Sequence, residues 1–198
     1  MKFEIDKKTG SIIAGAAVIA FQLGTGLNHN REDGWGFGMM GMHNSSNSGF
    51  SANDIMFAQM MIPHHQQAVE MSDLALATST NPKILALAKQ IRDAQAPEIS
   101  QMKKWLTSAG TSLMGAHGMT MDGMLTDSEI ATLKASKGNE FDRLFLSGMI
   151  GHHEGALTMV SMIVNSDNAE ARTLANNIKV SQSAEIAMMK EYLATLAK

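Results

Sequence analysis

The sequence predicts an all-α protein, an antiparallel four-helix bundle built from two tandem helical hairpins, with a hydrophobic segment at the N-terminus. Three observations predict this fold. A stretch with two adjacent histidines occurs twice, as MMIPHHQQAVEM from Met60 and as GMIGHHEGALTM from Gly148. Each copy is followed by a second helical pattern that carries the segment Q-x-x-E-I-x-x-M. Around both copies the apolar residues recur at intervals of three and four, which is the spacing of a helix with one buried face.

The internal repeat sets the architecture. His64 and His65 recur as His152 and His153 at a shift of 88 residues, and the second helices repeat at a shift of 87. Two similar helical hairpins in tandem imply a bundle with internal pseudo-two-fold symmetry. With 198 residues the chain is long enough for one such domain and a tail.

Residues 1–27 are predicted to be a signal peptide or an N-terminal membrane anchor, because lysines precede a largely apolar run. We favour an uncleaved anchor, since no Ala-x-Ala cleavage site follows the run. A buried N-terminal helix of the domain is the alternative. Residues 28–50 are rich in Gly, Ser and Asn, and we expect them to form a flexible linker. This linker carries Met42 and His43.

Residues 51–198 are predicted to form the bundle, and local signals place its helices. Polar caps and an early proline mark three helix starts: Ser51, Asn81-Pro82, and the capping box of Thr126 with Glu129. We therefore expect long helices over residues 54–78, 82–108, 140–165 and 168–197, with a short helix between 126 and 138.

The histidine pairs are predicted to face the bundle interior together with two carboxylates. At about 100° per residue, His64 and His65 fall on either side of the buried stripe of their helix, and the second pair repeats this. The seams of the second helices place polar side chains at core positions, namely Gln95 and Glu98 in one hairpin and Gln182 and Glu185 in the other. Burying an unpaired carboxylate costs several kcal/mol. A metal cation would compensate this cost, and a network of His–Glu hydrogen bonds is the alternative.

Methionine supplies the other candidate ligands. The chain has 18 methionines, more than its Phe, Tyr and Trp residues together, and no cysteine. A thioether is a soft ligand that suits copper(I), and thioether with imidazole favours copper over iron, zinc or magnesium. For any single core methionine, packing is the alternative. The candidate metal ligands of the core are His64, His65, His152, His153, Glu98, Glu185, Met61, Met149, Met71, Met159, Met102 and Met189.

Two Met/His-rich loops add further candidate ligands outside the helices. They are Met42 and His43 in the linker, and Met114, His117, Met119, Met121 and Met124 in the middle of the chain. We expect these loop methionines to be exposed, with nothing to pack against. Within the helices, Pro63 and Gly151 occupy equivalent positions before the two His pairs, where each weakens the helix.

Together these motifs resemble the ferritin-like domain of unknown function 305 family. The resemblance rests on the two histidine stretches, the lead-in GNEFDRLFL and the two Q-x-x-E-I-x-x-M segments, and it covers about residues 51–198. It implies a ferritin-like bundle in a secreted or membrane-anchored bacterial protein, and some members of the family resemble copper-tolerance proteins. The signature positions that it implies are His64, His65, His152, His153, Met71, Met159, Glu98, Glu185, Met102 and Met189. Gly151 departs from the family, because many members have Pro there.

The predicted function is extracytoplasmic binding of copper(I) or copper(II), for sequestration, tolerance or transfer. Another transition metal is left open. Besides the metal, the expected partners are a membrane and a copper-transfer protein. A net charge of −3 without a long basic run argues against nucleic acid. One alternative is a copper or iron oxidase with the bundle core as its redox centre, although the Glu-x-x-His motif of di-iron bundles is missing. Another is a structural module whose histidines satisfy one another.

Overall fold

The computed structural model describes residues 48–113 and 121–196, which contain five α-helices and no strand. The helices are α1 (Ala52–Thr78), α2 (Pro82–Ser108), α3 (Asp127–Ala135), α4 (Gly138–Val160) and α5 (Ala169–Leu196). The predicted all-α fold is confirmed, with four long helices and one short one. The main difference is at α4, which ends at Val160 because hydrogen-bonded turns replace the helix over the next residues.

The helix starts follow the capping chemistry that the sequence predicts. Ser51 and Asp54 form a reciprocal capping box at α1, where the backbone N–H of Ser51 donates to Oδ2 of Asp54 over 2.8 Å. Thr126 and Glu129 do the same at α3, and Asn81 caps α2 in front of Pro82. Each such cap is worth about 1 kcal/mol, because it satisfies a backbone donor at the helix start.

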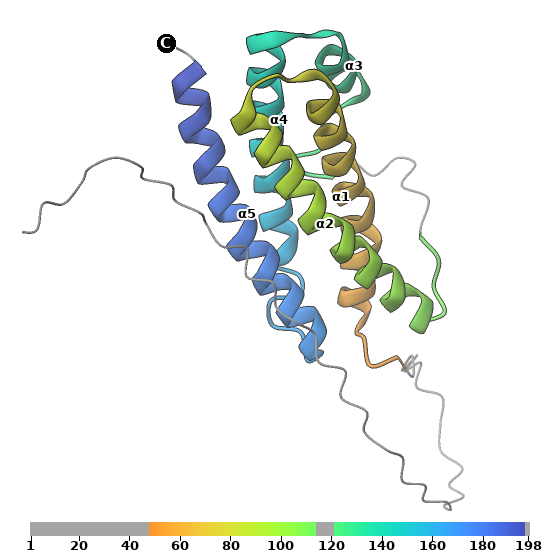
Figure 1. Cartoon of the computed structure of the whole chain (residues 1–198). Helices are drawn as coiled ribbons and strands as arrows, with labels where there is room; N and C mark the ends of the chain where they lie inside the picture. The colour runs from red at the N-terminus through yellow and green to blue at the C-terminus, as the bar shows by residue number, and fades with distance from the viewer. Residues whose placement is uncertain (1–47, 114–120, 197–198) are drawn as a thin grey trace, which may run out of the picture. The chain divides into compact units, whose positions relative to one another are not determined.

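The two hairpins pack against each other with α1 antiparallel to α4 and α2 antiparallel to α5 (Figure 1). A buried hydrogen bond of 2.6 Å from Oγ of Ser79 to Oδ1 of Asp142 ties the end of α1 to the start of α4. Nε1 of Trp105, near the end of α2, donates to Oε2 of Glu170 in the first turn of α5 over 3.1 Å. These contacts at opposite ends of the bundle fix how the hairpins align.

The apolar core falls into two clusters along the bundle axis. The first contains Phe57, Ile62, Trp105, Val160 and Ile178, and the second contains Ala75, Ile84, Ile91, Phe141 and Phe145. In α1 and α4 the two histidine pairs occupy the turns where one cluster gives way to the other. A polar layer therefore separates two apolar layers.

Residues Met121–Leu125, which we call the strap, lie before α3 and contact both α1 and α4. The side chain of Gln67 on α1 exchanges two hydrogen bonds of 2.8 Å with the backbone of Leu125. Gly123 has φ +80°, and a Cβ there would overlap the carbonyl oxygen of Gly151 on α4. A Cβ at Gly155 would likewise overlap the carbonyl oxygen of Asp122. The strap is thus fixed on the bundle by contacts that only these small residues permit.

The strap corrects the expectation that the methionines of this loop are exposed. Met121 is buried, and Met124 is half-buried, because the strap folds back onto the helices. Met114, His117 and Met119 lie outside the described residues, as do Met42, His43 and the hydrophobic N-terminal segment 1–27. Among the residues that the structure describes, no helix is sufficiently long and apolar to cross a bilayer.

Candidate metal centre

The four histidines of the repeat form one buried layer between α1 and α4. His64, His65, His152 and His153 are all fully buried. The rings of His64 and His152 lie in contact across the pseudo-two-fold axis, with centroids 3.7 Å apart and planes inclined by 38°. Within each pair the rings are further apart, at 6.5 Å for His64 and His65 and 6.3 Å for His152 and His153. The structure therefore brings the two predicted pairs together in a single layer.

Each hairpin contains one His–Glu pair with the same geometry. Nε2 of His65 lies 2.8 Å from Oε2 of Glu98, and Nε2 of His153 lies 2.8 Å from Oε2 of Glu185. The surroundings of the two carboxylates differ. Oε1 of Glu185 accepts a hydrogen bond of 3.0 Å from Nε2 of Gln90 and its side chain is 4% exposed, whereas that of Glu98 is 16% exposed.

The remaining two histidines differ because the strap offers a hydrogen-bond acceptor to only one of them. Nε2 of His64 lies 3.3 Å from the backbone carbonyl oxygen of Asp122. Since a carbonyl can only accept, this nitrogen carries the proton. Neither ring nitrogen of His152 has a hydrogen-bond partner at normal geometry among the described residues.

In the described part of the chain, most of the buried polar side-chain atoms without partners lie in this layer or one helical turn from it. They are Nδ1 of all four histidines, Nε2 of His152, both amide atoms of Gln95 and Oε1 of Gln182. Leaving a buried polar atom unpaired costs about 1–3 kcal/mol. Native interiors therefore supply a partner from protein, water or a bound ion.

Burial keeps the two central rings neutral. Desolvation, with a smaller contribution from His65, lowers the pKa of His64 from 6.5 to about 3. Desolvation and the neighbouring His64 and His153 also lower the pKa of His152 well below its usual range. A neutral imidazole is the form that ligates metals, so protons compete weakly for these rings at neutral pH.

The ring centres within each adjacent pair are about as far apart as those of two imidazoles bound to one ion would be. Two metal–nitrogen bonds of about 2.0 Å, with about 1.2 Å more from each nitrogen to its ring centre, give ~6.4 Å between centres in a linear arrangement. The observed spacings of 6.5 and 6.3 Å match this value. Among the described residues, no group of three or more His, Asp or Glu side chains is arranged to hold one ion.

The six candidate core methionines are buried on both sides of the histidine layer. Met61, Met102 and Met159 belong to the first apolar cluster, and Met71, Met149 and Met189 belong to the second. The repeat relates these two sets, because a shift of 88 or 87 residues converts one into the other. These methionines thus belong to the apolar clusters on both sides of the layer, where their side chains fill the core.

Sequence reasoning missed four groups that hold the layer in place: Gln67, Gln90, the Asp122 carbonyl and Gly155. The repeat offered a signal for two of them. Gly155 is the equivalent of Gln67, so the same position carries a side chain that binds the strap in one hairpin and no side chain in the other. Gly151, expected to loosen the helix, lies within α4, and a Cβ there would contact nothing.

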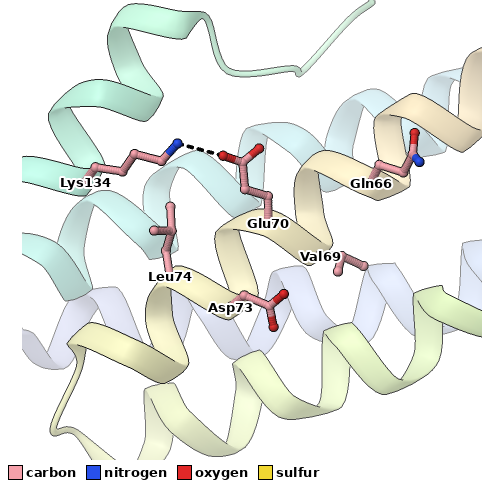
Figure 2. A pocket seen from close by; sticks show the side chains of 6 residues that line it. All are labelled: Gln66, Val69, Glu70, Asp73, Leu74 and Lys134. Carbon is pink, nitrogen blue, oxygen red and sulfur yellow. Dashed lines mark hydrogen bonds and ion pairs between the residues drawn. The ribbon is translucent and has the colours of Figure 1, made fainter.

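A surface hollow on the outer side of α1 is separate from this layer. It is lined by Gln66, Val69, Glu70, Asp73, Leu74 and Lys134 (Figure 2). Nζ of Lys134 on α3 donates to Oε1 of Glu70 over 2.8 Å, and both side chains are about half exposed. None of the lining side chains belongs to the histidine layer.

Comparison with known proteins places this geometry in context. The sequence profile described as domain of unknown function (DUF305) matches residues 54–193. A comparison with curated proteins found no match. Among solved structures, a DUF305 protein from Streptomyces coelicolor is 31% identical with a TM-score of 0.69, over 73% of this chain and 94% of that one.

Two further solved structures are similar over the same region. A DUF305 fragment from Deinococcus radiodurans is 29% identical with a TM-score of 0.68, over 74% of this chain and 98% of that one. CopM in its Cu(I)-bound form is 33% identical with a TM-score of 0.62, over 72% of this chain and 96% of that one. Similar structures also include CopM in Ag-bound, Cu(II)-bound and apo forms.

Proposed function

Since the chain belongs to the DUF305 family, we propose that it is an extracytoplasmic copper-binding protein that sequesters copper or passes it to a partner. The observation that carries this proposal is the layer of four fully buried histidines, each with an unpartnered Nδ1. Two of these rings are held neutral by burial. A neutral nitrogen without a hydrogen-bond partner is a metal ligand that needs no rearrangement of protons.

Copper(I) suits the inventory of this layer better than a hard cation. It accepts imidazole and thioether ligands, and here imidazoles form the layer while methionines belong to the clusters on either side of it. Mg²⁺ and Ca²⁺ instead need several oxygen ligands. The spacing of each adjacent His pair fits a shared ion. The similarity to CopM supports the same choice, since CopM has been seen with Cu(I), Ag and Cu(II).

In this proposal residues 51–198 form the metal-binding domain, and the adjacent histidine pairs bind the ion. The core methionines line the layer as weaker, soft donors. Met42, His43, Met114, His117, Met119, Met121 and Met124 contribute further, weaker copper(I) sites. Segment 1–27 acts as a signal or anchor outside the cytoplasm, and 28–50 serves as the linker. One support for this location is the Streptomyces coelicolor neighbour, which is described as a candidate secreted protein.

A competition titration of the full chain with a chromophoric copper(I) chelator tests the proposal. We expect the protein to withdraw copper(I) from the chelator, and the double variant His65→Ala, His153→Ala to lose the tightest sites. The matched control is Lys134→Ala, which removes a surface cation that pairs with Glu70 on α1. Lys134 is not part of the histidine layer.

Equal copper(I) binding by the wild type and the double variant would contradict the proposal. Catalytic oxidation of a cuprous or ferrous substrate by oxygen, lost in the double variant, would instead support the oxidase alternative. Both variants are checked for intact helix content by circular dichroism, so that a loss of binding is not a loss of fold.

A further inference from the structure

We propose that Glu98, Glu185 and the Asp122 carbonyl are positioning groups rather than metal ligands. Each accepts a hydrogen bond from the Nε2–H of one histidine and so directs the unprotonated Nδ1 of that ring to the metal. This inference rests on the proposed function, which it deepens by naming the ligating atom. It also replaces the expectation that both carboxylates bind the ion directly.

The two hairpins provide independent copies of the same arrangement. In each, the carboxylate lies 2.8 Å from Nε2, the ring is fully buried, and Nδ1 has no partner. An ionised carboxylate can only accept, so the proton of a neutral ring sits on Nε2 and the lone pair on Nδ1. The opposite tautomer would leave a buried N–H without an acceptor and place a carboxylate against an unprotonated nitrogen.

His64 reaches the same tautomer through a different group. Its Nε2 donates to the Asp122 carbonyl over 3.3 Å, and its Nδ1 is also unpartnered. Three of the four rings therefore leave the same atom, Nδ1, unprotonated and without a hydrogen-bond partner. His152 has no acceptor of normal hydrogen-bond geometry among the described residues, and only the backbone of His64 acts on its pKa as a weak hydrogen-bond partner.

Ligand chemistry favours this division of roles. A soft ion prefers imidazole nitrogen and thioether sulfur to carboxylate oxygen. A carboxylate that holds the far nitrogen of a ligating histidine fixes the orientation of the ring and makes the near nitrogen more basic. Both carboxylates already stand at hydrogen-bond distance from their rings, and Gln90 holds the second oxygen of Glu185.

The test is nitrogen NMR of the histidine rings in the full chain, first without metal. We expect the Nε2–H tautomer at His65 and His153. Glu98→Leu should remove this preference at His65 and leave His153 unchanged, so that the second hairpin serves as the internal control. Glu98→Gln keeps an amide oxygen acceptor and should restore the tautomer at least in part. If Glu98 had only a structural role, His65 in Glu98→Leu would keep the tautomer that it has in the wild type.

Copper(I) is diamagnetic, so the same spectra follow metal binding. Adding copper(I) to the wild type should shift the Nδ1 resonances of His65 and His153 and leave the proton on Nε2 in place. Glu98→Leu should weaken copper(I) binding by about 10–100-fold while the number of ions bound stays the same. Solvent exchange of the Nε2 proton should be slower at His153 than at His65, because Glu185 is less exposed than Glu98.

The outcomes separate this inference from the function on which it rests. An Nδ1–H tautomer in the apo protein, or loss of the Nε2 proton on copper loading, overturns the inference even though copper binds. Fewer bound ions in Glu98→Leu, with its fold intact, shows that the carboxylate is a ligand and also overturns it. Correct tautomers without any copper binding refute the proposed function, and the inference fails with it.

Discussion

Acidification of the metal-free protein should destabilise the fold through the two central histidines. Unfolded histidine has a pKa of about 6.5, whereas burial lowers the pKa of His64 in the folded protein to about 3. Between these values the unfolded chain binds a proton that the folded chain refuses. Stability is therefore fully present above pH 6.5 and falls as pH decreases towards 3.

The magnitude follows from this window. Between pH 6.5 and pH 5, an interval of about 1.5 pH units, His64 is protonated in the unfolded chain but not in the folded one. Each unit lowers the free energy of unfolding by about 1.36 kcal/mol, so the loss at pH 5 is about 2 kcal/mol. The lowered pKa of His152 acts in the same direction. A loss of this size is a large part of the stability of a typical domain.

Urea denaturation with a metal chelator present, followed by circular dichroism at a series of pH values, measures this loss. The matched variant is His64→Gln, which can still donate to the Asp122 carbonyl but does not titrate. Its baseline stability will differ, so the readout is the slope, which should be shallower than that of the wild type by about 1.4 kcal/mol per pH unit below pH 6. The reasoning is refuted if both proteins show the same slope, or if wild-type stability is flat from pH 7.5 to pH 5.

Two other outcomes follow from the same structure. Gly155→Ala should lower the free energy of unfolding by about 1–3 kcal/mol, since a Cβ there would overlap the Asp122 carbonyl. Gly151→Ala should be neutral or stabilising by up to about 1 kcal/mol, because open space surrounds that position. Urea denaturation midpoints compare the two variants, and equal midpoints would contradict the packing of the strap. Copper(I) at a hundredfold excess over its Kd should raise the free energy of unfolding by about 2.7 kcal/mol at neutral pH, measured by thermal melts, and coincident melts with and without metal would contradict binding to the folded state.

The helices could be predicted because their signals are local. The capping boxes at Ser51 and Thr126 and the proline after Asn81 act within one turn, and the structure places α1, α2 and α3 where these signals indicate. The hairpin repeat could be predicted because it needs only the sequence compared with itself. Sequence patterns place the end of α4 several residues too late, because hydrogen-bonded turns follow Val160 and continue the apolar spacing of the helix.

The pairing of histidines with carboxylates was open in the sequence, and the structure shows His65 with Glu98 and His153 with Glu185. Helical periodicity placed all four side chains on inward faces but could not say whether the carboxylates meet a ring or an ion. The position of the strap could not be predicted from the sequence, because its contacts join residues 58 positions apart, such as Gln67 and Leu125. Loop composition alone indicated exposed methionines, and Met121 is buried because of those distant contacts.

The strap also explains why a duplicated sequence holds a layer that is not fully symmetric. A single segment cannot obey a two-fold axis, so it meets α1 with one side and α4 with the other. The first hairpin accordingly has Gln67, which binds Leu125, and the second has Gly155, which leaves room for the Asp122 carbonyl. His64 donates to that carbonyl and His65 donates to Glu98, so both rings of the first pair have an acceptor of normal geometry, whereas in the second pair only His153 has one and His152 has the weaker backbone contact with His64. Two copper ions bound to this layer should therefore differ in affinity, with the more fully oriented pair losing less rotational freedom on binding.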